Sequence, residues 1–165
     1  MGRIAKVLEF IRGVGGQSDT KCDPGGGAIR QARHFQGAGD DAPPLPGDYA
    51  ALVEAPQTGG FVAVGYVDPL TEQTAAPGER RLYARTADGA QIVELWLKAD
   101  GSARLSNAGG YLELEAEGDV VGNGARMTRD GDVVTSDGVS LRGHTHAQGS
   151  DSGDNTEQET EPPTL

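Results

Sequence analysis

From residue 87 onward, turn signals divide the chain into segments that are too short to bury the face of a sheet. Asp-Gly pairs and glycine-rich breaks recur through this region and become more closely spaced towards its end. Asp-Gly pairs supply the positive φ that tight turns require. The last strand candidates between the breaks are residues 125–129, 133–135 and 139–141. Because a two-stranded hairpin is marginal in water, this pattern favours a fold that other copies of the chain complete.

Residues 111–117 alternate strictly between apolar and acidic side chains. With period two, successive side chains point to opposite faces of a strand. The two faces carry Leu112, Leu114 and Ala116 on one side and Glu113, Glu115 and Glu117 on the other. We expect the carboxylates to form a row on a solvated face. Three copies wound around one axis would turn the apolar side chains inward and leave no free strand edge, which predicts a triangular prism.

The composition also indicates that one chain builds a core with difficulty. Glycine accounts for 26 of the 165 residues, hydrophobic residues for 36% and aromatic residues for only 5%. Repetition, a metal or further copies would have to supplement such a core. The net charge of −11 argues against non-specific nucleic-acid binding, which relies on Lys and Arg. It also argues against docking on anionic lipid by charge.

Charge divides the chain into two regions. Residues 1–86 carry nine basic and ten acidic side chains, whereas the remainder has a net charge of −10, which favours two structural units. In the first region we expect strands at residues 29–35, 49–54, 61–67 and 81–85. The turn signal at residues 56–60 joins the middle two into a hairpin, while residues 4–11 fit a helix as well as a strand. About five strands predict a small barrel or sandwich such as an OB-fold.

Cys22 is the only cysteine, so no disulfide can form within the chain, and a free thiol fits a reducing cytosol. The amino-terminal residues lack the long apolar stretch of a signal peptide. No apolar run approaches the roughly 18 residues of a membrane span. We therefore expect a soluble protein that is not secreted through a cleaved leader.

A histidine pair, His144 and His146, follows the last strand candidate. In an extended chain, residues two apart project from the same face. One chain then offers two imidazole nitrogens, and three chains offer six, which suits an octahedral transition metal such as iron. A His-x-His pattern is also common by chance, and in an exposed tail it usually binds nothing specific. His34 has no such neighbour and is interpreted as a structural residue.

Four stretches of the chain follow one another in an order typical of a known family. They are residues 45–54, 60–69, 77–83 and 137–146, the last of which ends in a Gly-Val-x-Leu-x-x-His-x-His pattern. From about residue 29 to residue 146 the chain resembles the baseplate assembly protein V, or central tail-spike, family of contractile-tailed bacteriophages such as phage Mu. The first 28 residues align poorly with that family.

The resemblance implies an all-β protein with three parts. Residues 1–86 would form an OB-fold-like collar, and residues 87–142 a trimeric, intertwined β-helical needle with the shape of a triangular prism. Residues 143–165 would form the apex, where His144 and His146 of three chains hold one iron ion octahedrally. The carboxyl-terminal tail is expected to fold back over this tip.

The function that the resemblance implies is structural. The homotrimer would be the central spike of a tail baseplate in the virion, assembled in the host cytoplasm and attached to the hub at the end of the tail tube. On contraction it would pierce the host envelope, touching the outer membrane transiently and binding no nucleic acid. We do not expect the protein to be an enzyme. Hydrolysis by a pair of carboxylates requires an environment that shields one of them from water, and nothing in the sequence provides it for Glu113, Glu115 and Glu117. The alternatives are a receptor- or glycan-binding tail tip and an oligonucleotide-binding OB-fold protein.

Overall fold

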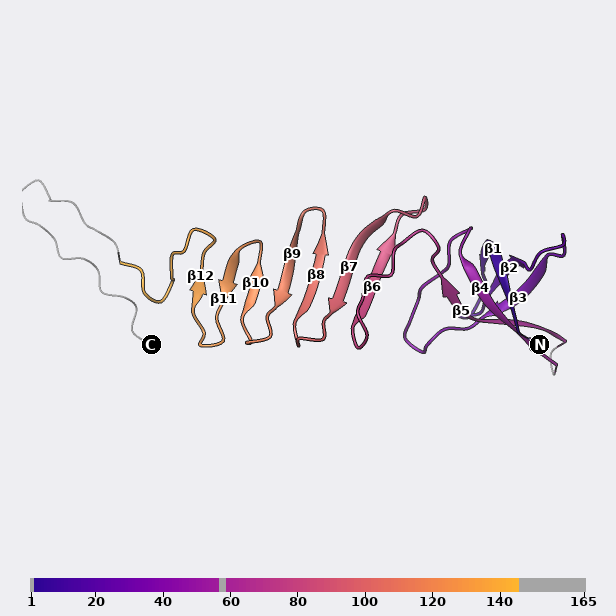
Figure 1. Ribbon diagram of the computed structural model, residues 1–165, viewed down its shortest axis with the longest axis horizontal. Helices are drawn as coiled ribbons and strands as arrows, with labels where there is room; N and C mark the ends of the chain where they lie inside the picture. Colours follow the sequence, from indigo (N-terminus) through magenta and orange to yellow (C-terminus); the bar gives the residue numbers. More distant parts are fainter. Residues whose placement is uncertain (1, 57–58, 146–165) are drawn as a thin grey trace, which may run out of the picture. The chain divides into compact units, whose positions relative to one another are not determined.

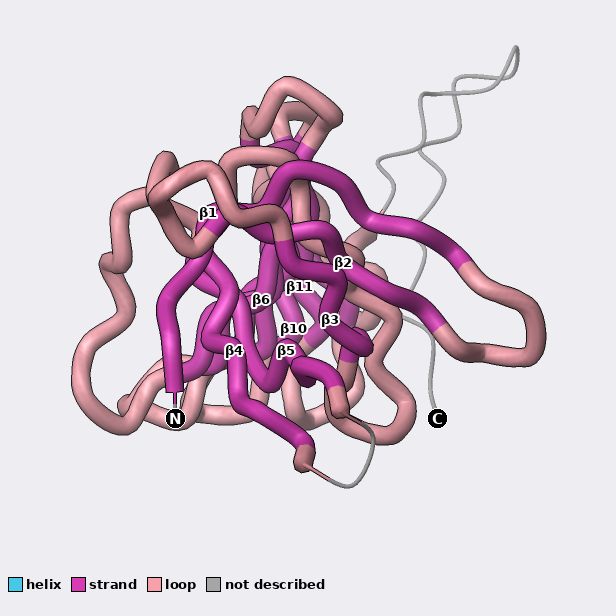
Figure 2. Tube along the Cα trace, turned by 90° about the vertical axis from the view of Figure 1, so that its right-hand side faces the viewer, coloured by secondary structure: helices cyan, strands magenta, loops and turns pink. Residues whose placement is uncertain are grey.

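A computed structural model describes residues 2–56 and 59–145 of the chain. Every regular element in these ranges is a strand, as Figures 1 and 2 show, which confirms the expected all-β class. The described residues include no helix that is long and apolar enough to cross a membrane. They fall into two compact units: a barrel unit that runs to Gln73 and includes Ala87–Gly89, and a sheet unit formed by Thr74–Thr86 and the residues from Ala90.

The barrel unit is a closed five-stranded barrel with strand order β1-β2-β3-β5-β4. β3 and β5 run parallel, whereas the other neighbouring pairs, including β1 with β4, are antiparallel. This architecture is compatible with the OB-fold expected from the sequence. The predicted hairpin on either side of residues 56–60 is confirmed as β4 and β5. The strands are β1 (Gly2–Arg12), β2 (Ser18–Asp23), β3 (Arg30–His34), β4 (Tyr49–Ala55) and β5 (Gly60–Val67).

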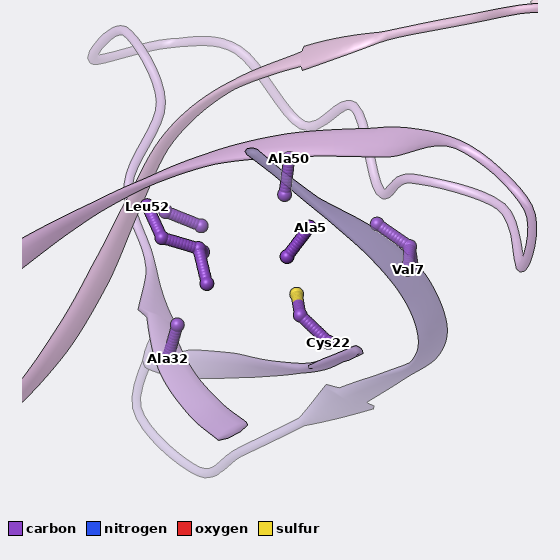
Figure 3. Packing of buried hydrophobic residues seen from close by; sticks show 7 residues of the cluster. Ala5, Val7, Cys22, Ala32, Ala50 and Leu52 are labelled. Carbon is purple, nitrogen blue, oxygen red and sulfur yellow. The ribbon is translucent and has the colours of Figure 1, made fainter. Parts of the chain in front are cut away.

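Small side chains fill the barrel. Four of the seven fully buried residues of its core are alanines, joined by Cys22, Val7 and Leu52. Their side chains converge on the barrel interior in Figure 3. A five-stranded barrel leaves little room inside, so small residues pack it well. A chain with few large hydrophobic residues can therefore still build this core.

The first strand, which the sequence left ambiguous, is bent by a β-bulge. Its first residues, Gly2 to Lys6, pair with β4, and from Lys6 onward it pairs with β2. The register shifts between Val7 and Glu9. A bulge increases local twist and bends a strand, which lets β1 join both edges and close the barrel.

The sheet unit is a seven-stranded antiparallel meander in which each strand pairs with its neighbours in sequence (Figure 1). The division of the chain differs from the boundary expected at residue 86. Residues 80–85 pair along their length with β7 and therefore belong to this unit. The strands are β6 (Arg80–Arg85), β7 (Gln91–Leu97), β8 (Ala103–Asn107), β9 (Gly110–Leu114), β10 (Val120–Gly122), β11 (Ala125–Met127) and β12 (Val133–Val134).

Four turns that lie wholly within the sheet unit share one hydrogen-bond pattern. In each, the first residue donates its N–H to the carbonyl of the fifth at 2.8–2.9 Å. The fourth residue is a glycine with φ between 86° and 100°, a conformation that costs other residues free energy. The turn signals in the sequence are thus explained by backbone geometry. The turns are residues 98–102, 115–119, 128–132 and 135–139.

The last strands are as short as the sequence predicts. β10 and β11 have three residues each and β12 has two. Residues 139–141, a further strand candidate, contribute a single bridge between Ser140 and Val134.

Candidate association face and histidine tip

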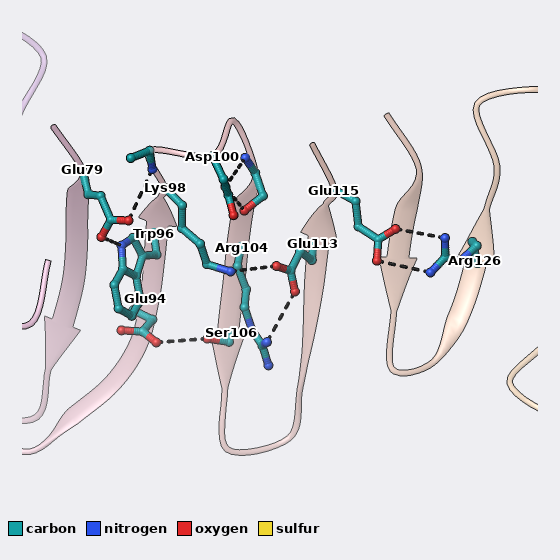
Figure 4. A network of polar contacts seen from close by, with 12 residues as sticks. Glu79, Glu94, Trp96, Lys98, Asp100, Arg104, Ser106, Glu113, Glu115 and Arg126 are labelled. Carbon is teal, nitrogen blue, oxygen red and sulfur yellow. Dashed lines mark hydrogen bonds and ion pairs between the residues drawn. The ribbon is translucent and has the colours of Figure 1, made fainter. Parts of the chain in front are cut away.

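One face of the sheet unit carries a network of ion pairs that join its strands and turns, part of which is drawn in Figure 4. Four cations and four carboxylates meet in it, so these contacts balance in charge. The N–O distances lie between 2.6 and 3.4 Å. The pairs are Arg81–Glu94, Lys98–Glu113, Arg104–Glu113, Arg126–Glu115 and Arg126–Asp119.

Aromatic rings cover part of this charged face. The Arg104 guanidinium lies 4.2 Å from the centre of the Tyr111 ring, within the range of a cation–π contact. Arg81 lies over Trp96 at 5.7 Å and donates to Glu94 at 2.6 Å. That hydrogen bond holds the pKa of Glu94 below its usual range. The charged face thus satisfies its own polar groups within one chain.

The expected row of solvated carboxylates is wrong. β9 ends at Leu114, so Glu115 and Glu117 lie in the turn that follows it. Glu113 lies directly opposite Arg104 in the register of β8 and β9, and its side chain is only 18% exposed. Alternation gives the face of a strand correctly, but a cation on the neighbouring strand decides whether a carboxylate on that face meets water.

The opposite face of the sheet unit is apolar and open. The register places Leu82 opposite Leu95, Leu95 opposite Leu105, and Leu105 opposite Leu112, so a continuous leucine row crosses β6 to β9. Leu112 is 53% exposed, far more than Glu113 on the charged face. We call these half-exposed residues the leucine face: Leu82, Leu97, Leu105, Leu112, Leu114 and Met127.

His144 is held by backbone carbonyls just beyond the sheet. Its Nδ1 lies 3.1 Å from the carbonyl oxygen of Ser140 and 3.0 Å from that of Leu141. Carbonyl oxygens only accept, so Nδ1 carries a proton, and in the neutral ring the lone pair is then on Nε2. In metal-binding histidines, the ring nitrogen that does not bind the metal usually donates its N–H to an acceptor such as a backbone carbonyl. His144 therefore fits the role of an Nε2 metal ligand.

The second predicted ligand, His146, lies outside the described residues. Within residues 2–56 and 59–145 no group of three or more His, Cys, Asp or Glu side chains could hold a metal ion. A site on a three-fold axis takes its ligands from three chains, so one chain by itself cannot display it. Of the two predicted ligands, the structure describes His144 alone.

His34 has partners that the sequence did not reveal. Its Nδ1 lies 2.7 Å from the Tyr66 hydroxyl, which also contacts Thr20 Oγ1 at 2.9 Å. Phe10 packs edge-on against the imidazole at 5.1 Å. These contacts join four strands of the barrel and agree with a structural role. They also hold Phe10 and Tyr66 in contacts within the barrel unit.

No protein-family model matches the chain, and a search of curated proteins found no significant match.

The ion-pair network was missed by sequence reasoning, although one part of it had a signal. Asn123-Gly124 is a two-residue hairpin signal, and a two-residue turn fixes the register of the strands beside it. That register sets Val121 opposite Arg126 and brings Arg126 to Asp119. Arg104 and Glu113 also face each other across a two-residue turn, residues 108–109. Arg81 and Glu94, in contrast, lie on strands joined by the longer turn of residues 86–90, whose register the sequence does not fix.

Proposed function

We propose that this chain is the central spike at the tip of a contractile phage tail, acting as a homotrimer. The observation that carries the proposal is the leucine face, half exposed in one chain while the opposite face satisfies its own charges. An apolar face of this extent on a sheet of very short strands gains stability when it is removed from water. Three copies that turn this face to a common axis would form the β-helical prism expected from the sequence.

The two faces of the sheet unit explain how such a spike could work. With the leucine face inside, the ion pairs of the charged face would lie outside and cross-link neighbouring strands. A closed prism has no free sheet edge to pair or to buckle. Tail contraction would then drive a narrow, rigid object against the host envelope, and no residue need do chemistry.

At the apex, His144 and His146 of three chains would hold one iron ion. The ion would supply a bond between chain ends where the sheet has no core left, in the way that structural metals add folding free energy. His144 supports this assignment because its Nδ1–H is already committed to backbone carbonyls. The barrel unit, with its OB-fold-like architecture, would form the collar that docks on the tail hub.

Mass and metal content of the full-length protein test the assembly. Light scattering should give three times the chain mass of 17.1 kDa, and elemental analysis should give one iron per three chains. The double variant His144→Ala/His146→Ala should remain trimeric and lose the iron. A monomer at micromolar concentration would refute the spike, and iron retained by the double variant would refute the site.

Location in the virion needs a separate experiment. An antibody raised against the sheet unit should label the tips of contractile tails isolated from cells that encode this chain. Labelling confined to the soluble fraction, with bare tail tips, would contradict the proposed role even if the protein is a trimer.

A further inference from the structure

Two consecutive segments of the sheet unit repeat each other at an interval of thirteen residues. Residues 118–121 and 131–134 both read Gly-Asp-Val-Val, and an arginine closes each segment, at Arg129 and Arg142. The first segment contains β10, β11 and the turns beside them. The second contains β12 and the bridge at Ser140.

The same backbone contact occurs in both segments. Asp119 Oδ1 accepts the amide N–H of Arg129 at 2.9 Å, and Asp132 Oδ1 accepts the amide N–H of Arg142 at 3.0 Å. Each aspartate is the last residue of a five-residue turn, 115–119 or 128–132, with matching backbone hydrogen bonds. Each turn is therefore fastened to the segment that follows it by an equivalent carboxylate.

The two segments also occupy equivalent places in the sheet. Val120 and Val133 both lie opposite Met127, one on each side of β11, while Val121 and Val134 both lie opposite Arg126. The first valine of each pair therefore lies on the leucine face and the second on the charged face. Sequence, contacts and register all repeat together.

We propose that residues 118–130 are one complete structural repeat and that the number of such repeats sets the length of the sheet unit. The segment adds one strand in each direction, so its removal preserves both strand direction and face. In the shortened chain Val133 would take the place of Val120 opposite Leu114. This inference concerns the sheet of one chain and does not rest on the proposed spike function.

The second segment differs where a terminal repeat should differ. The first segment turns through Asn123-Gly124, where both residues have positive φ. The second turns through residues 135–139 with a longer hydrogen-bonded loop, and its returning strand shrinks to one bridge. Terminal units of repeat proteins are commonly altered because they cap the stack.

Two in-phase variants of the full-length chain test the proposal: deletion of residues 118–130 and tandem duplication of the same residues. The control deletes residues 118–123, which removes one strand. In the control, Arg126 would lie opposite Leu114 and Met127 opposite Glu113, which exchanges the apolar and charged faces. The readouts are hydrogen exchange of the β9 amides and the maximum dimension from X-ray scattering.

In the in-phase variants, exchange of the β9 amides should stay within about threefold of the unaltered chain, and in the control it should rise by at least about tenfold. Strands lie about 4.8 Å apart, so the sheet should shorten or lengthen by roughly 10 Å. The shortened chain loses stabilising contacts as well as a repeat, so its β9 amides can lose protection for that reason alone. Protection that is retained in either of the two in-phase variants therefore supports the repeat. If both lose protection as fully as the control, the proposal is overturned.

Discussion

A single hydroxyl group joins three strands of the barrel. The Tyr66 hydroxyl contacts His34 and Thr20, and Thr20 is fully buried. Tyr66→Phe would leave both partners without this bond in a place that water reaches poorly. We expect the free energy of unfolding of the barrel to fall by about 1–3 kcal/mol, measured by denaturation.

The matched control for this change is Tyr49→Phe. Tyr49 is 44% exposed, so water can hydrogen-bond to its hydroxyl. Loss of this hydroxyl should lower the free energy of unfolding by less than about 0.5 kcal/mol. Equal losses in the two variants would show that the Tyr66 hydrogen bonds contribute nothing special to the barrel.

Leu112 tests the leucine face at the scale of one side chain. Leu112→Asp places a charge in the middle of the proposed interface, and burying three unpaired carboxylates there would cost several kcal/mol per trimer. We expect the variant to be monomeric by light scattering. Val14→Asp, at a position that is 96% exposed in the barrel unit, should stay trimeric. A trimeric Leu112→Asp protein would exclude this face from the interface.

At the scale of elements, three carboxylates bind the turns of the sheet unit together. Hydrogen bonds to Glu79, Asp119 and Asp132 favour the ionised form and hold the pKa of each below its usual range. In each case the largest cause is one hydrogen bond: the amide of Ala76 for Glu79, the amide of Arg129 for Asp119, and the hydroxyl of Ser140 for Asp132.

These directions set the sign of the acid response. A carboxylate with a lowered pKa stabilises the fold above its unfolded value, near 4, and that stability is lost as the pH falls through the lower folded value. We expect the sheet unit to weaken as the pH falls below about 4, which can be measured by Trp96 fluorescence in urea. Asp119→Asn/Asp132→Asn removes the titration and keeps one of the two acceptor oxygens of each side chain. The variant should be less stable at neutral pH, and its stability should depend less steeply on pH. An unchanged slope would contradict this explanation.

Elements differ in how far the sequence determines them. The β4–β5 hairpin was predictable because its turn signal and both strands are adjacent in the chain. β6 was assigned to the barrel since its own residues do not reveal that β7 is its partner. For the same reason alternation gave the face of Glu113 and not its contact with Arg104. For the predicted metal site, the structure places His144, and His146 lies outside the described residues.

At the scale of the whole molecule, the two units have different sources of stability. The barrel unit closes on itself and buries its own small core, so it should fold within one chain. Among its residues up to 145, the sheet unit has one buried apolar residue, Val121, and an open leucine face. If its stability comes from association, it must depend on protein concentration, whereas that of the barrel must not.

The chain carries one probe for each unit. Trp96, the only tryptophan, lies in β7, and Cys22, the only cysteine, lies in the barrel core. Burial raises the pKa of the Cys22 thiol, so thiol reagents should label it only when the barrel opens. A tenfold rise in protein concentration should stabilise a trimer by about 2.7 kcal/mol. The unfolding transition reported by Trp96 should then move to a higher urea concentration, whereas the urea concentration at which Cys22 becomes labelled should not change. If neither transition depends on protein concentration, the sheet unit is stable without association.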